Sequence, residues 1–63
     1  MNAKTAGWKA LCSAIARAGD AFAVHHLQET DLEFCREFCQ EFHYSFELDQ
    51  AGDERIATFT PKG

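Results

Sequence analysis

The sequence contains little that would serve a secreted scaffold or a membrane anchor. It has one proline, and no apolar run approaches the roughly 20 residues that cross a bilayer. No charged segment followed by an apolar one opens the chain, as a secretory signal would. The three cysteines, an odd number, argue against a secreted disulfide framework. We therefore expect a cytoplasmic protein with reduced thiols and without a membrane partner.

The chain is also short, and its 63 residues are enough for one domain spanning residues 1–63. A domain of this size buries roughly 60% of the surface of its unfolded chain, so its stability is marginal. We therefore expect every large apolar side chain to be needed for the core.

Basic residues are scarce, and the net charge is -4. Residues 1–19 carry three basic residues and no acid, whereas residues 20–54 hold all ten acids against Arg36 alone. Arg55 and Lys62 follow near the end. An acidic chain repels phosphate backbones unless its basic groups converge, so this charge disfavours nucleic acid as a partner.

Two stretches have the apolar spacing of amphipathic helices. From Thr5 to Ala18 apolar residues recur every three or four positions, and Gly19 is suited to end a helix in the left-handed conformation. A second helix is predicted after Thr30, which with Glu33 forms a capping-box pattern, while Asp31 adds negative charge to the first turn.

The second helix has the clearer division into two faces. At 100° per residue its apolar side chains share one arc of about 160°. These are Leu32, Phe34, Cys35, Phe38, Cys39 and Phe42. The remaining side is occupied by Glu33, Arg36, Glu37, Gln40, Glu41 and Tyr44.

Three further stretches favour strands. Residues 21–27 alternate and are read as a strand, with the alternative that the first helix continues to Leu27 through a kink at Gly19. Apolar and polar residues alternate again from Tyr44, and residues 55–60 are rich in Ile, Thr and Phe. The turn-rich residues 50–53 join these two runs into a hairpin, and Pro61 ends it.

These elements predict the α+β class. Their order is helix, strand, helix, strand, strand, and the simplest arrangement is a three-stranded sheet with both helices packed on one face.

Candidate catalytic and metal-binding groups are few. Cys35, Cys39 and His43 are spaced four residues apart, and with His25 or His26 they would supply the ligand types of a zinc site. Both thiols, however, lie within the apolar arc, where cysteine behaves as a small hydrophobe. A nucleophilic cysteine needs a base, exposure and a lowered pKa. We therefore expect no metal, no cofactor and no enzymatic activity.

The most prominent interaction feature is an acidic stripe on the second helix. Glu33, Glu37 and Glu41 follow one another at steps of four residues, so their carboxylates share one exposed side. Like charges at this spacing repel one another by tenths of a kcal/mol per pair. A basic protein surface would relieve that repulsion.

The half of the chain from Asp31 to Lys62 resembles the small domain family named for its Arg-xxx-His motif, which binds single-stranded nucleic acid. The positions that carry the resemblance are Asp31 at the helix start, Gly52 in the hairpin, Arg55 leading the last strand and Lys62 after it. Leu32 and Arg36 stand where the family has its arginine and histidine. The resemblance implies the same element order and a nucleic-acid contact through Arg36, Arg55 and Lys62.

The sequence thus leads to two functional hypotheses. The first is a non-enzymatic interaction protein, a regulator, adaptor or inhibitor, that contacts another protein through Glu33, Glu37 and Glu41. The alternative is a single-stranded nucleic-acid-binding domain of the Arg-xxx-His type with a degenerate motif.

Overall fold

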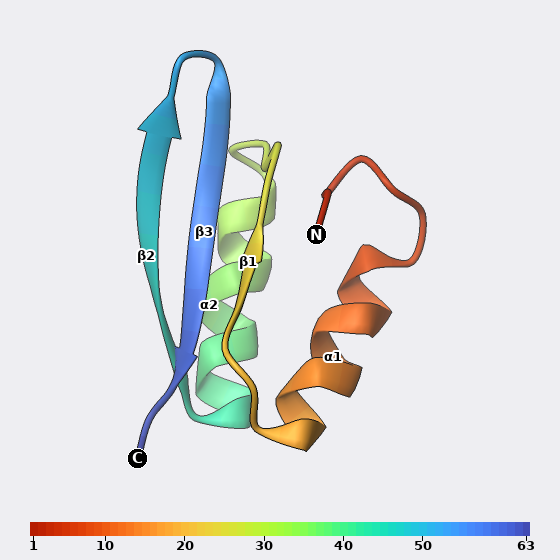
Figure 1. Ribbon diagram of the computed structural model, residues 1–63, viewed down its shortest axis with the longest axis vertical. Helices are drawn as coiled ribbons and strands as arrows, with labels where there is room; N and C mark the ends of the chain where they lie inside the picture. Colours follow the sequence, from red (N-terminus) through yellow and green to blue (C-terminus); the bar gives the residue numbers. More distant parts are fainter.

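The computed structural model describes residues 1–63 and consists of two helices and a three-stranded sheet (Figure 1). In order, the elements are α1 (Trp8–Ala18), β1 (Phe22–Val24), α2 (Asp31–Phe42), β2 (Tyr44–Ala51) and β3 (Glu54–Pro61). This order confirms the predicted α+β fold. Neither helix combines the length and hydropathy that a bilayer crossing requires.

The sheet has the order β1-β3-β2, and β3 is antiparallel to both neighbours. Phe59 of β3 lies opposite Phe22 of β1 and Phe46 of β2, so three aromatic side chains share one face. In Figure 1, α2 lies behind this sheet and α1 lies beside β1. The opposite face of the sheet has no helix over it.

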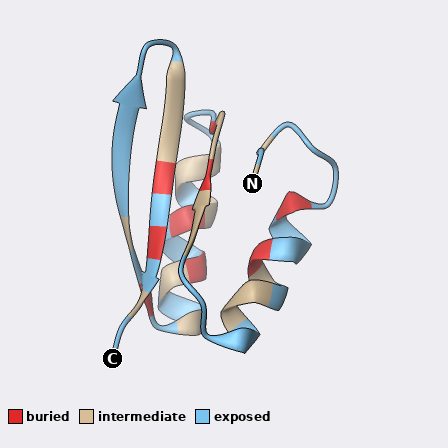
Figure 2. Ribbon diagram, viewed as in Figure 1, coloured by how far each residue is buried: buried red, intermediate tan, exposed pale blue.

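Aromatic side chains from α2 and the sheet form the core. The ring centroid of Phe38 lies 5.4 Å from that of Phe59 and 5.7 Å from that of Tyr44, and Phe22 stacks on Phe59 at 4.8 Å. The buried set, marked in Figure 2, is Trp8, Cys12, Val24, Leu27, Cys35, Phe38, Tyr44, Ala57 and Phe59. This set confirms the predicted apolar arc of the second helix at its centre.

Glycines in the left-handed conformation set both ends of α1. The helix begins at Trp8 rather than at the expected Thr5, because Gly7 has a φ of 80°. It ends at Gly19, with a φ of 77°, whose N–H donates to the carbonyl of Ala16. The alternative of a helix continuing to Leu27 is therefore wrong, and the strand is confirmed, although it is limited to Phe22–Val24.

The start of α2 differs from the predicted capping box. Thr30 is in the right-handed helical region and its side chain makes no capping hydrogen bond. Instead, the Asp31 carboxylate accepts a 2.9 Å hydrogen bond from the backbone N–H of Gln28. An N3 carboxylate makes the same contact in a capping box. Here, however, the donor residue Gln28 lies two positions before Thr30, the predicted cap.

The end of α2 also differs from the prediction, at Tyr44. His43, with a φ of 58°, closes the helix, so Tyr44 is the first residue of β2 and not part of the polar helix side. Tyr44 is buried, and its hydroxyl donates to the carbonyl of Asp20 at 2.8 Å. The predicted hairpin is confirmed, with Gly52 and Asp53 as the two residues between paired Ala51 and Glu54.

Two large apolar side chains lie outside the core, contrary to the expectation that all of them would be buried. Leu11 is 52% exposed and Leu48 is 46% exposed. Trp8 of α1 packs edge-on against Phe34 of α2 with centroids 5.1 Å apart. Because α1 packs there through only part of its apolar stripe, Leu11 is left uncovered.

Candidate functional site

The acidic residues predicted to contact a protein partner lie together on α2. Glu33, Glu37 and Glu41 are all exposed, on the side of the helix away from buried Cys35 and Phe38. We call these three residues the acidic α2 face. None of their carboxylates has an ion-pair or hydrogen-bond partner, since both ion pairs of the structure are made by Glu54. The face therefore presents free negative charge.

The basic residues implied by the nucleic-acid resemblance are dispersed. Arg36 is exposed on α2, Arg55 is partly buried at the start of β3, and Lys62 is exposed beyond its end. Lys62 lies seven positions after Arg55 along extended chain, about 23 Å away at 3.3 Å per residue. The structure therefore does not gather all three into one patch.

The thiols lie in or beside the core. Cys12 and Cys35 are fully buried, and this burial raises the pKa of each thiol from 9.0 to about 11. Burial also raises the pKa of half-buried Cys39, partly offset by the Lys62 ammonium. Such thiols remain protonated near neutral pH and are weak nucleophiles.

The residues considered as metal ligands do not converge. Cys35 faces the core, whereas His43 is exposed at the end of α2. Nowhere in the structure are three His, Cys, Asp or Glu side chains arranged to hold a metal ion.

A cluster that sequence reasoning did not find joins the end of β1 to the start of β3. Glu54 Oε2 lies 3.0 Å from His25 Nδ1 and 3.3 Å from His26 Nε2. His26 reaches this position through a left-handed backbone, with a φ of 62°. All three side chains are partly exposed, and the contact links the β1 edge to the hairpin. Nothing local in the sequence pairs residues so far apart, so only the β1–β3 register reveals it.

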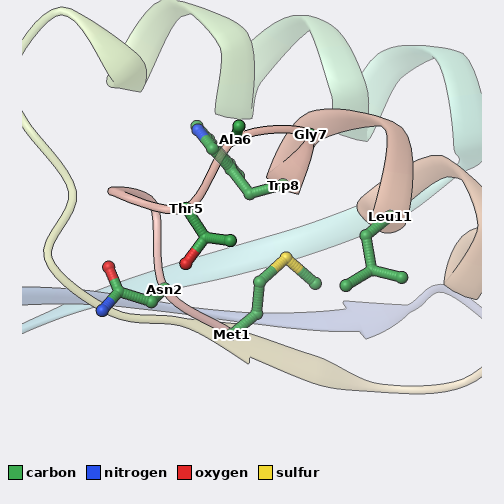
Figure 3. Close-up of a pocket in the computed structure, with 7 residues that line it drawn as sticks. All are labelled: Met1, Asn2, Thr5, Ala6, Gly7, Trp8 and Leu11. Carbon is green, nitrogen blue, oxygen red and sulfur yellow. The ribbon is translucent and has the colours of Figure 1, made fainter.

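A small pocket lies where the N-terminal segment meets α1 (Figure 3). It has a volume of about 200 Å³. The lining residues are Met1, Asn2, Thr5, Ala6, Gly7, Trp8 and Leu11. None of these side chains titrates, and the α-ammonium group of Met1 donates a 3.0 Å hydrogen bond to the carbonyl of Ala23. The pocket is also smaller than the roughly 300 to 1,000 Å³ of ordinary ligand sites.

The structure places the signature positions of the Arg-xxx-His resemblance on α2, where Leu32 is half-buried and Arg36 is exposed. The order of helices and strands agrees with what that resemblance implies. Nucleic-acid binding stays a prediction from sequence. No protein-family model, curated protein or solved structure matches this chain.

Proposed function

We propose that this protein is a non-enzymatic interaction module that binds a basic surface of another protein through the acidic α2 face. The observation that supports this most is the set of three exposed, unpaired carboxylates of Glu33, Glu37 and Glu41. A regulator, adaptor or inhibitor needs such a recognition surface and no reactive group. The buried, protonated thiols and the pocket without titrating side chains agree with this role.

The acidic α2 face destabilises the isolated protein. Glu37 lies one helical turn from both Glu33 and Glu41, and each such pair of like charges costs about 0.2 to 0.5 kcal/mol. Glu41 also lies in the last turn of α2, which contains no basic residue. An acid near the negative end of the helix dipole is unfavourable by about 0.3 to 1 kcal/mol. A basic partner would offset both costs.

The cytoplasm is the compartment we propose for this activity. Cys12, Cys35 and Cys39 are all free thiols. Reducing compartments keep cysteines in that state.

Charge reversal of the acidic α2 face tests the proposal. The variant Glu33→Lys, Glu37→Lys, Glu41→Lys should stay folded, because the three side chains are exposed and lysine favours helix. Partner capture from the native host, followed by mass spectrometry, should lose those partners that bind through basic surfaces. The matched control Asp20→Lys, Glu29→Lys, Asp53→Lys changes the net charge equally at other exposed sites and should keep them.

The same variants decide the alternative function. If the protein binds single-stranded nucleic acid through Arg36, Arg55 and Lys62, the wild type should bind short oligonucleotides, more strongly at low than at moderate salt. Reversal of the acidic α2 face should then strengthen that binding. Equal partner capture by the wild type and the triple reversal would contradict the protein-binding proposal.

A further inference from the structure

The two edges of the sheet differ in how they are covered. The β1 edge is paired with the N-terminal segment, where His25 N–H donates to the carbonyl of Met1 and Ala3 N–H donates to the carbonyl of His25. The outer edge of β2 pairs with nothing along its eight residues. Figure 2 shows β2 as exposed over most of its length.

The backbone groups that point out of this edge can be identified. Antiparallel pairs alternate between hydrogen-bonded and non-hydrogen-bonded residues. Lys62 N–H donates to the His43 carbonyl, whereas the Arg55 carbonyl faces β1 and accepts from Leu27 N–H. The first bond shows that residue 43 is hydrogen-bonded to the β3 side, so every second residue after it along β2 is too. The second bond agrees, because it shows that Arg55 of β3 bonds to the β1 side.

The odd-numbered residues of β2 therefore bond to β3, and the even-numbered residues direct their N–H and C=O outward. We define the β2 edge as the outward backbone groups of Phe46, Leu48 and Gln50. Pro61, which has no N–H, lies opposite Tyr44, a non-hydrogen-bonded pair that needs no such donor.

The side chains along the β2 edge are of two kinds. On the helix side lie half-buried Phe46 and Leu48, which is 46% exposed. On the open side of the sheet lie exposed Glu47 and Asp49, opposite uncharged Thr58 and Ile56 of β3. Neither carboxylate has an ion-pair partner.

A second copy of the chain fits this edge poorly. Antiparallel pairing of β2 with itself, centred on Glu47, places Glu47 against the same residue of the other copy. Centred on Leu48, it places Glu47 against Asp49 of the other copy. Like charges directly opposite one another destabilise a strand pair. The acids thus hinder self-pairing, as charges on natural edge strands do.

We propose that the β2 edge binds an extended segment of a partner protein in which basic residues alternate with apolar ones. The partner backbone adds a fourth strand through the groups of Phe46, Leu48 and Gln50, which supply affinity. Its lysine or arginine side chains lie beside Glu47 and Asp49, and its apolar side chains cover Phe46 and Leu48. This surface is separate from the acidic α2 face.

A blocked peptide of alternating lysine and valine, with the eight-residue length of β2, is a suitable probe. At saturation, amide hydrogen exchange of Phe46, Leu48 and Gln50 should slow by about tenfold, since these N–H groups become hydrogen-bonded. The amides of Glu47 and Asp49 already bond to β3 and should change little. A peptide of the same composition with the lysines in one block should give no such protection.

Variants of β2 locate the contact. Leu48→Pro removes one outward N–H while leaving the bonds to β3, as proline does on edge strands, and should abolish the protection. Glu47→Lys with Asp49→Lys, which keeps every backbone group, should weaken peptide binding by about tenfold or more. The control Asp20→Lys with Glu29→Lys changes the charge equally at exposed sites outside β2 and should weaken it less.

Three results would overturn the proposal. The first is an unchanged exchange rate at Phe46, Leu48 and Gln50 in the presence of the peptide. The second is equal weakening by the two double reversals, which would show attraction by net charge alone. The third is a dimer in sedimentation experiments with these same amides protected, which would make a second copy the occupant. None of them depends on the acidic α2 face.

Discussion

Phe38 is the residue at which the aromatic core converges. Its ring lies within 5.8 Å, centroid to centroid, of rings from all three strands and from its own helix. Those rings belong to Phe22, Phe34, Phe42, Tyr44 and Phe59. The side chain is 2% exposed, so its removal leaves a cavity that its neighbours fill only in part.

We expect Phe38→Ala to lower the free energy of unfolding by about 3 to 5 kcal/mol. That is most of the stability of so small a domain. Glu37→Ala, on the exposed side of α2, should stay within about 0.5 kcal/mol of the wild type. Urea unfolding of both variants measures the difference. Equal losses would mean that the register of α2 is wrong.

Apolar periodicity predicted which side chains share a face but not whether that face is covered. Phe38 and Leu11 both fit the apolar stripe of their helices, yet one is buried and the other is 52% exposed. The difference arises because α2 lies over the middle of the sheet while α1 lies beside β1 (Figure 1). Such placement depends on long-range contacts, which a local pattern does not contain.

At the scale of elements, the N-terminus of α2 can be stabilised either by Thr30 or by Asp31. The sequence pattern assigns the capping role to Thr30, whereas in the structure the Asp31 carboxylate accepts from Gln28 N–H at 2.9 Å. Asp31→Ala should therefore cost about 0.5 to 2 kcal/mol through the lost cap. Its charge near the positive end of the helix dipole adds to that loss.

Thr30→Ala is the matched comparison, because Thr30 is exposed and makes no side-chain hydrogen bond to the helix. It should change stability by no more than about 0.5 kcal/mol. Thermal melts of the two variants rank the contributions. A larger loss for Thr30→Ala would restore the capping box predicted from the sequence.

The hairpin and the helix start show why some elements were predictable. Alternation in β2 and a glycine in the turn determine the pairing locally, so the sequence alone predicts the β2–β3 hairpin. The choice between Thr30 and Asp31 depends on the path of residues 28–30, which Leu27 sets by donating its N–H to Arg55 of β3. That contact spans two elements, and no window of the sequence reveals it.

The candidate sites also differ in whether local sequence is enough to predict them. The acidic α2 face follows from helical spacing alone, so it was predicted residue by residue. The β2 edge was not, because a strand becomes an edge only through the order of strands in the sheet.

At the scale of the whole molecule, buried thiols couple stability to alkaline pH. Burial raises the pKa of Cys12 and of Cys35 to about 11 in the folded protein, from 9.0. A group whose pKa is higher in the folded state contributes its full stabilisation below the lower pKa. That stabilisation is lost as the pH rises through the folded value, because ionisation then favours the unfolded chain.

We therefore expect stability in the presence of a reductant to be constant from pH 7 to 8 and to fall above about pH 9. At pH 10 the loss should be about 1.4 kcal/mol for each of the two thiols. The pKa of Tyr44 is also raised by burial, so its ionisation adds to the loss at still higher pH.

Urea unfolding of the wild type and of Cys12→Ala at pH 8 and 10 measures the effect. The variant starts from a lower stability because of its cavity, but the difference between its two pH values should be smaller than that of the wild type by about 1.4 kcal/mol. The same loss in both proteins would show that the Cys12 thiol does not ionise on unfolding as its burial predicts.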